Sequence, residues 1–150
     1  MEEIYQRIPH RPPFLFLDSI LEKSVDRLTA EKTWTVDEGF YAGHYPGNPI
    51  TPGVLLCESV FQAGAVFLSQ RMEALDGEAD ALSGTTPVLS RIEGAKFKAM
   101  VKPGETCRIE VQYKEQLSRF HFLRGKVLNA AGKTALTLEF ALALVEGPNE

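Results

Sequence analysis

A histidine and a glutamate, fourteen residues apart, are the side chains of this sequence best suited to proton transfer. Both belong to the segment Gly43–Glu58 (GHYPGNPITPGVLLCE), in which His44 stands near the start and Glu58 closes a strongly apolar stretch. Histidine titrates near neutrality, and apolar surroundings disfavour the charged form of a carboxylate. A base and an acid held at a fixed separation are what proton-transfer chemistry requires.

The chain between these two residues is restricted at some positions and free at others. Prolines limit the backbone, whereas glycines permit turns that other residues resist. Three of each occur here: Pro46, Pro49, Pro52, Gly43, Gly47 and Gly53. Because this composition is costly for an idle connector, we expect the loop to place His44.

A long helix is predicted directly after the loop. From Val54 to about Leu75 the sequence is apolar on nearly every helical face, which is typical of a buried helix. Its apolar run is interrupted by Glu58, Ser59 and Gln62, so it indicates a core helix and no membrane span. Residues 76–87 (DGEADALSGTTP) are predicted to form a polar loop.

Strands are predicted where apolar and polar residues alternate with a period of two. They are Leu28–Val36, a stretch around Ile109, Val111 and Tyr113, a stretch beginning at Phe120 and Phe122, and Lys133–Glu146. His121, between two phenylalanines, is predicted to face outward. The turn Asn129–Gly132 implies antiparallel pairing. We therefore predict an α+β fold in which an antiparallel β-sheet of five or six strands wraps around the long central helix.

Composition narrows the class of protein further. With 150 residues, 44% hydrophobic and 24% charged, the chain is expected to form one globular domain over residues 1–150. The two cysteines, Cys57 and Cys107, have no CxxC spacing and no histidine cluster, so we expect no metal site or disulfide, and a reducing cytoplasm. The N-terminal sequence MEEIYQRIPH lacks the apolar core of a signal peptide.

Charge is unevenly distributed along the sequence. The net charge of −4 gives no reason to expect nucleic-acid binding. Between Arg91 and Lys133, however, ten Lys and Arg residues stand against four Asp and Glu, a local balance of +6. Two interpretations stay open for this region: ordinary solvated outer faces of strands, or a basic surface that docks an acidic partner.

Several motifs resemble those of one enzyme family. They are Pro9–Leu15 (PHRPPFL) with Asp18, Gly43–Gly47 (GHYPG), Pro49–Leu55 (PITPGVL) with Glu58 and Gln62, Ala95–Phe97 (AKF) and Val101–Glu105 (VKPGE). From about Ile4 to Val145 the chain is similar to the β-hydroxyacyl-(acyl carrier protein) dehydratases of the FabZ type, which have the hotdog fold. The central block, with histidine and glutamate at this spacing, is its most specific part.

The resemblance implies a cytoplasmic enzyme, without cofactor, that dehydrates (3R)-hydroxyacyl thioesters on acyl carrier protein to trans-2-enoyl thioesters in fatty acid or related lipid biosynthesis. His44 matches the catalytic histidine and Glu58 the catalytic carboxylate. It further implies a homodimer in which these two residues come from different subunits. Three such dimers are expected to assemble into a hexamer. Glutamate at position 58 is more similar to the dehydratase-only branch than to the dehydratase/isomerase branch.

In this hypothesis His44 acts on C2 of the substrate, and Glu58 assists the departing hydroxyl. Gly53, at the start of the helix, would direct a backbone N–H toward the thioester carbonyl. Gln62 lies four residues after Glu58 on the same helical face and would orient it. His10 is expected to fix the N-terminal chain, and Cys57 has no evident base partner for a nucleophilic role.

Structural interpretations and other functions compete with this one. Instead of a catalytic role, His44 could cap a turn of its loop, and Glu58 could form a buried structural ion pair. The family often has Arg or Lys where Asn48 stands, a bulky apolar residue at Thr51 and an aromatic residue at Pro12. These departures leave carrier contacts and acyl-chain preference open. A hotdog acyl-thioesterase and a non-catalytic acyl-binding subunit are the alternative functions.

Overall fold

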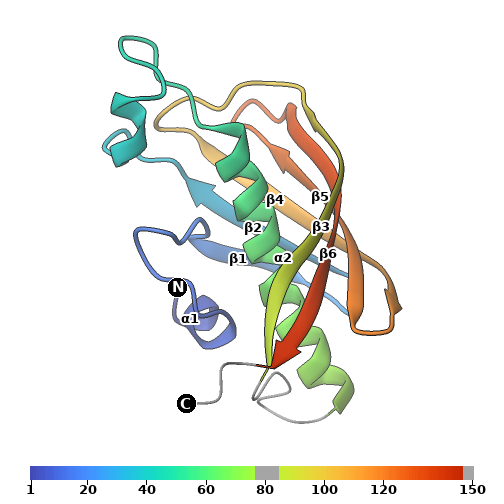
Figure 1. The fold of residues 1–150 in the computed structure, drawn as a ribbon. Helices are drawn as coiled ribbons and strands as arrows, with labels where there is room; N and C mark the ends of the chain where they lie inside the picture. The colour runs from blue at the N-terminus through green and yellow to red at the C-terminus, as the bar shows by residue number, and fades with distance from the viewer. Residues whose placement is uncertain (77–84, 147–150) are drawn as a thin grey trace.

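The structure, a computed structural model, describes residues 1–76 and 85–146 and has the predicted α+β architecture (Figure 1). Six antiparallel strands form a single sheet in the order β1-β2-β4-β5-β6-β3, and the helix α2 (Gly53–Asp76) lies against one face of it. The strands are β1 (Ser19–Lys23), β2 (Arg27–Thr33), β3 (Thr85–Phe97), β4 (Thr106–Leu117), β5 (Phe120–Leu128) and β6 (Thr134–Glu146). The short helix α1 (Glu2–Arg7) and the 3-10 turn η1 (Gly39–Ala42) complete the described elements.

The central helix agrees with the sequence prediction to within one residue at each end. Pro52 immediately precedes it, and the Pro52 carbonyl accepts the N–H groups of Leu55 and Leu56, which starts the helix. Residues 61–69 are all buried between the sheet and the N-terminal segment. By length and composition Gly53–Leu75 would be apolar enough to cross a membrane, but 72% of its most apolar window is buried inside the protein. The prediction of a core helix is confirmed.

Alternation along the strands defines the two faces of the sheet. In β4, Cys107, Ile109 and Val111 are buried, whereas Arg108 and Gln112 are exposed. This is the period-two pattern expected of a sheet with one covered face. The prediction from Ile109, Val111 and Tyr113 is confirmed, and the buried set packs under α2.

The prediction that His121 faces outward is wrong. His121 is 2% exposed and lies beside Leu123 on the inner face of β5. The outer positions belong to Phe120 and Phe122, in phase with Arg124. Arg124 therefore indicates correctly which face of β5 is the outer one, because a charged side chain seldom faces the core.

Other differences concern boundaries. β2 ends at Thr33, three residues before the predicted end at Val36, and Trp34 then fills the core without continuing the strand. The predicted polar loop over 76–87 is shortened, because Thr85–Pro87 already belong to β3. Its residues 77–84 lie outside the described part of the chain.

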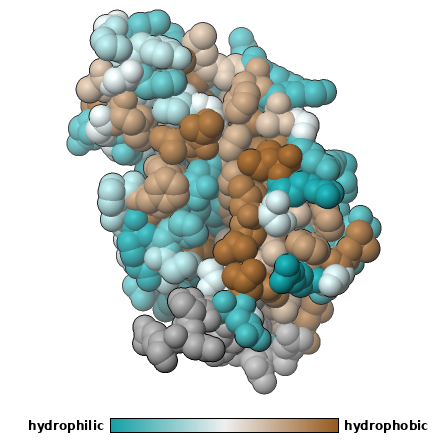
Figure 2. All heavy atoms as spheres, viewed as in Figure 1, coloured by the Kyte–Doolittle hydropathy of each residue, from teal (hydrophilic) through white to brown (hydrophobic). Residues whose placement is uncertain are grey.

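One long strand at the sheet edge has an unpaired side. Among the described strands β3 pairs with β6 alone, and all of its residues from Val88 to Phe97 are exposed. Hydrophobic side chains gather in a band over this strand and the neighbouring helix (Figure 2). Exposed members of this set are Val88, Leu89, Ile92, Phe97 and Val54. A long apolar edge strand is a ready template for pairing with another chain.

Candidate active site

His44 is held by a closed set of hydrogen bonds within its loop. Its backbone N–H donates to the Phe40 carbonyl at 3.1 Å, at the end of η1. The Ile50 N–H donates to the His44 carbonyl at 3.0 Å, and the His44 ring nitrogen Nδ1 lies 2.9 Å from the Ile50 carbonyl oxygen. The ring also stacks on Tyr45, with 4.4 Å between the centroids. The loop therefore fixes both the backbone and the ring of His44.

The hydrogen bond to Ile50 also determines which ring nitrogen is available for chemistry. A carbonyl oxygen only accepts, so Nδ1 of His44 must carry the proton that it shares with Ile50. In the neutral imidazole, Nε2 then has the free lone pair. His44 is thus arranged as a base that accepts a proton at Nε2.

Glu58 is attached to the N-terminal segment through Gln62. The Gln62 amide nitrogen donates to Glu58 Oε1 at 3.2 Å and to the Phe14 carbonyl at 3.1 Å. Its amide oxygen accepts the Phe16 N–H at 2.8 Å. Because the Phe16 N–H can only donate, the orientation of the Gln62 amide is determined, and its NH2 group must face Glu58. Gln62 is 1% exposed, which shields these bonds from water.

A second side chain reaches the same carboxylate oxygen, and the sequence did not reveal it. His10 Nε2 lies 3.7 Å from Glu58 Oε1, and both side chains are about one quarter exposed, at 28% and 23%. Burial lowers the pKa of His10, while the Glu58 carboxylate acts in the opposite direction. His10 and Glu58 are forty-eight positions apart, so only the tertiary fold brings them together.

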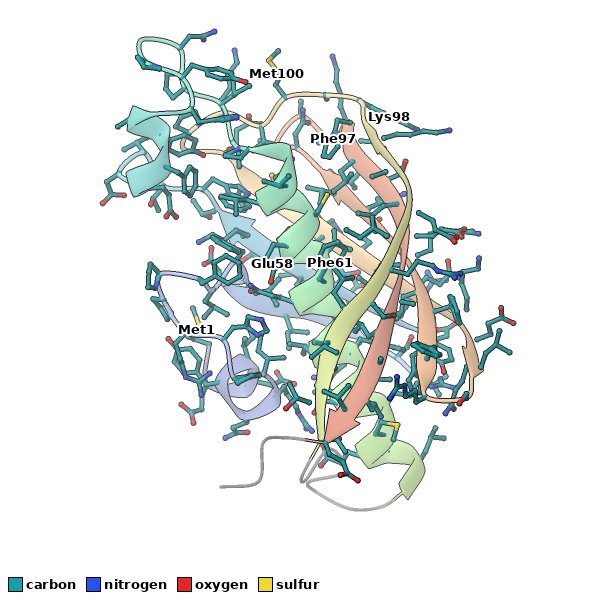
Figure 3. All side chains as sticks on the ribbon, in the orientation of Figure 1. Met1, Glu58, Phe61, Phe97, Lys98 and Met100 are labelled. Atoms are coloured by element: carbon teal, nitrogen blue, oxygen red, sulfur yellow. The ribbon has the colours of Figure 1, made fainter. Side chains whose placement is uncertain are left out.

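The start of α2 is closely covered by an aromatic ring. A Cβ atom on Gly53 would lie 2.6 Å from Phe97 Cε1, so no larger residue fits unless the ring moves. Figure 3 shows Phe97 at this end of the helix, with Glu58 further along it. The first N–H groups of a helix have no partner within it. Glycine at position 53 therefore lets the Phe97 ring lie directly over the helix start, and this ring is itself 55% exposed.

His44 and Glu58 of one chain are held separately. Among the described residues His44 bonds to Ile50, and Glu58 contacts Gln62 and His10, with no bond that joins the two. The chain therefore brings Glu58 together with Gln62 and places Gly53 on the same helix, whereas no hydrogen bond or ion pair among the described residues joins His44 to them. The neighbouring Cys57 is buried, and burial raises the pKa of its thiol, which keeps it protonated.

The unusual Thr51 has a partner that compensates for its polarity. Its hydroxyl lies 2.6 Å from the Tyr41 hydroxyl, and both residues are buried. Its backbone N–H donates to the Val101 carbonyl at 2.8 Å. Burial raises the pKa of Tyr41, so this phenol stays neutral. The pair ties the end of the His44 loop to η1.

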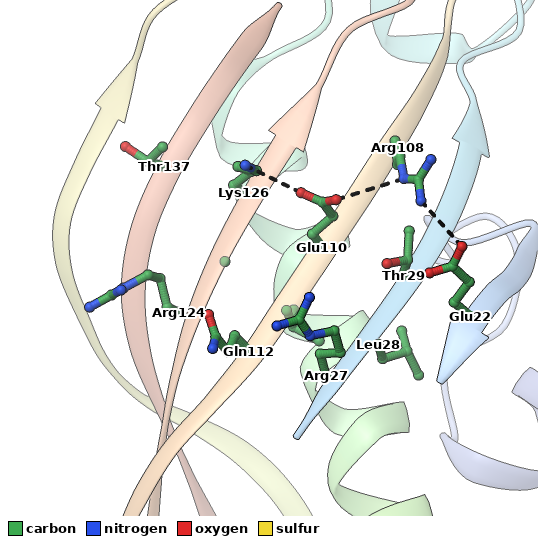
Figure 4. A pocket seen from close by; sticks show the side chains of 12 residues that line it. Glu22, Arg27, Leu28, Thr29, Arg108, Glu110, Gln112, Arg124, Lys126 and Thr137 are labelled. Atoms are coloured by element: carbon green, nitrogen blue, oxygen red, sulfur yellow. Dashed lines mark ion pairs between the residues drawn. The ribbon is translucent and has the colours of Figure 1, made fainter. Parts of the chain in front are cut away.

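A charged groove lies on the face of the sheet opposite to α2 (Figure 4). Its volume is about 470 Å3, and Arg108, Glu110 and Lys126 line it with ion pairs of 3.7 and 3.4 Å. Neither His44 nor Glu58 lines this groove. Most cations here are matched by carboxylates, which favours the interpretation of an ordinary solvated face.

Part of the basic region differs from this pattern. Lys96 and Lys98, near the end of β3, make no ion pair with the described residues and line a shallow hollow with Arg124. Arg124 is paired with Glu139 at 3.2 Å. Lys96 and Lys98 therefore place unmatched positive charge beside Phe97, although Lys102, Arg119 and Lys133 of the same region also make no ion pair with the described residues.

One sheet curved around one long helix defines a hotdog fold, with a histidine on the loop before the helix and a glutamate within it. Residues 8–137 match the family described as the FabA-like domain, and the chain belongs to this family. A protein of Caulobacter sp. (strain K31) named 3-hydroxyacyl-(acyl-carrier-protein) dehydratase FabZ is 36% identical over 147 residues, 97% of this chain and 86% of that protein. A protein of the same name from Enterococcus faecalis is 43% identical over 111 residues, 73% of each chain.

Solved structures agree on the fold. The dehydratase heterocomplex ApeI:P from Xenorhabdus doucetiae has a TM-score of 0.75 at 19% identity. The aligned region comprises 98% of this chain and 91% of the chain in that structure. The E. coli PaaI protein has a TM-score of 0.63 at 15% identity, and the aligned region comprises 83% of this chain and 81% of the PaaI chain. The hotdog fold and the FabZ-type resemblance predicted from the sequence are both confirmed.

Proposed function

We propose that this protein dehydrates (3R)-hydroxyacyl thioesters carried on acyl carrier protein, giving trans-2-enoyl thioesters in fatty acid biosynthesis. The observation that carries the proposal is the pair His44 and Glu58, each oriented by its own bonds, in a chain 36% identical to a FabZ dehydratase over almost its whole length. The reaction uses acid–base chemistry supplied by side chains. We assign it to the cytoplasm.

The elimination needs three contributions, and the described residues supply a candidate for each. His44 takes the proton from C2 at Nε2, and the released electron pair forms the C2–C3 double bond as the C3–O bond breaks. Glu58 assists the hydroxyl in one of two ways. As acid it supplies the proton with which the hydroxyl leaves as water; as hydrogen-bond partner it holds the hydroxyl while His44 returns to it the proton taken from C2. The N–H at Gly53 stabilises the developing charge on the thioester oxygen, as preorganised donors do. Gln62 keeps Glu58 in position.

The separation of His44 from Glu58 supports a site shared between two subunits. In this proposal the free edge of β3 pairs with β3 of a second copy, which covers the exposed Val88, Leu89 and Ile92. His44 of one subunit then acts with Glu58 of the other. Assembly of three such dimers into a hexamer is the further expectation, and light scattering of the purified protein tests both.

The acidic carrier protein is proposed to dock at the unmatched lysines. Lys96 and Lys98 flank Phe97, whose ring covers Gly53. A positive patch beside the start of α2 would raise the rate at which an acidic partner encounters this end of the helix. This position would bring the tethered substrate directly to the helix start.

Replacing His44 by Ala and, separately, Glu58 by Gln tests the reaction. Each variant should lose about 10²–10⁴-fold in the rate of hydration of a 2-enoyl thioester, the usual contribution of a positioned acid or base. Circular dichroism and light scattering should match the wild type, and His121→Asn, which lies away from the pair, serves as a control. Wild-type turnover in either variant would contradict the assignment. Release of free thiol would favour the thioesterase, and ligand binding without turnover the acyl-binding subunit.

A further inference from the structure

The two oxygens of the Glu58 carboxylate have different surroundings. Oε1 accepts from the Gln62 amide at 3.2 Å and faces His10 Nε2 at 3.7 Å. Oε2 makes no hydrogen bond or ion pair with the described residues. A terminal carboxylate rotates in a broad, roughly two-fold energy well. Contacts to one oxygen therefore fix the orientation of the carboxylate plane and leave the other oxygen free of contacts with the described residues.

His10 is itself held in place from the N-terminal segment. The neighbouring Arg11 donates to the carbonyls of Ile8 at 2.8 Å and Tyr5 at 3.1 Å, and its guanidinium lies 4.5 Å from the centre of the Tyr5 ring. The His10 ring stacks with Phe14 at 6.4 Å between centroids. Its Nδ1 is buried without a hydrogen-bond partner in the described chain, so Nε2 is the nitrogen through which His10 acts.

We propose that His10 is a positioning residue for Glu58, which together with Gln62 holds Oε1 and leaves Oε2 to face the substrate hydroxyl. This inference rests on the proposed function and adds a third member to the acid side of the site. Gln62 approaches from the same helix, whereas His10 approaches from the N-terminal segment. Two supports from different elements restrict the carboxylate more than either does alone.

The character of the contact follows from its length. At 3.7 Å it exceeds a direct hydrogen bond, so it acts through charge and dipole. The carboxylate favours a proton on the facing Nε2, which makes N–H the group directed at Oε1. Two charged groups act on His10: Glu58 from α2, which raises its pKa, and Arg11 from its own segment, which lowers it. Catalytic contacts are often long without substrate and tighten in the complex.

Two substitutions at His10 separate positioning from packing. His10→Gln keeps a donor near the place of Nε2, and His10→Leu keeps the bulk without a donor. We expect kcat of the Leu variant to fall roughly tenfold with KM within about twofold, since a displaced catalytic group mainly affects the reacting step. The Gln variant should recover most of this loss. Equal kcat in the Leu variant and the wild type would overturn the proposal.

A matched control addresses loosening of the N-terminus. Glu3 anchors α1 by accepting from Lys23 at 2.6 Å and Gln70 at 2.9 Å, without contact to Glu58. Glu3→Gln should leave kcat unchanged. If Glu3→Gln lowers kcat as much as His10→Leu does, the effect is general loosening and the positioning role is refuted.

A measurement without turnover keeps this inference separate from the proposed function. The titration of His10 is followed by NMR of the imidazole in the wild type and in Glu58→Gln. Because the carboxylate raises the pKa of His10, the midpoint should move to lower pH in the variant. An unchanged midpoint would refute the proposal that Glu58 and His10 interact. If the wild type shows no dehydratase activity but the midpoint moves, the proposed function fails and the pairing stands.

Discussion

Gln62→Leu removes the residue that connects Glu58 to the N-terminal segment while it keeps a side chain of similar size. Three hydrogen bonds are lost: from the Phe16 N–H, to the Phe14 carbonyl and to Glu58 Oε1. The leucine cannot accept or donate, so the fate of each former partner determines the cost.

The cost is set mainly by the Phe16 N–H. Phe16 is 3% exposed, and an unsatisfied buried donor costs about 1–3 kcal/mol. Phe14 is 50% exposed, so water can replace the bond to its carbonyl at little cost. We therefore expect a loss of about 2 kcal/mol in the free energy of unfolding, which for a protein of this size lowers Tm by about 4–8 °C.

The assay is thermal unfolding at one fixed protein concentration, because association would shift Tm. Gln70→Leu is the matched control on the same helix, since Gln70 makes one hydrogen bond, to Glu3 near the surface. Glu3 keeps its bond to Lys23 and is partly exposed to water, so the loss of this bond should cost less, about 0.5–1.5 kcal/mol. A Tm for Gln62→Leu equal to that of Gln70→Leu would refute the reasoning that the Phe16 N–H depends on Gln62.

Three further predictions concern charge, pH and thiol reactivity. Reversing Lys96, Lys98 and Arg124 to Glu should lower kcat/KM for carrier-bound substrate more than for the coenzyme A thioester, and equal losses would argue against docking there. Burial lowers the pKa of His121, so the unfolded state binds the extra proton and stability falls as pH drops below about 6.5. In His121→Asn the free energy of unfolding should decrease less steeply with falling pH, by up to about 1.4 kcal/mol per pH unit. Urea unfolding at pH 7.5 and 5.5 measures this difference. Burial raises the pKa of Cys107 to about 12, so this thiol should react with a maleimide only after denaturation, and rapid labelling of the native protein would contradict its burial.

The sequence predicted best what depends on local periodicity. The helix was found because apolar residues surround Glu58 and Gln62, and β4 because Ile109 and Val111 alternate with charged residues. His121 was misplaced because two flanking phenylalanines suggested a core face, although Arg124 in the same phase indicated an outer one. Aromatic residues tolerate partial exposure, so their parity is a weaker guide than that of a charge.

The candidate site was predicted only where its residues belong to one continuous block. His44, Gly53, Glu58 and Gln62 stand within twenty residues of one another, whereas His10 reaches Glu58 through tertiary packing. The same is true of the Gln62 bond to Phe16, which spans forty-six positions. Contacts of this kind leave no periodic trace; the motif Pro9–Leu15 includes His10, but the motif does not say which residue His10 contacts.

The position of β3 in the sheet has a consequence for biosynthesis. β3 follows α2 along the chain, yet its strand partner is β6, which the ribosome produces only after β4 and β5. Until β6 emerges, both edges of β3 are without a neighbour, and its apolar residues stay open to other nascent chains. Non-local pairing of this type is slow and leaves strands exposed to aggregation. Completion of the fold therefore gives β3 its strand partner only in the last step of synthesis, and its other edge still has no strand partner among the described residues.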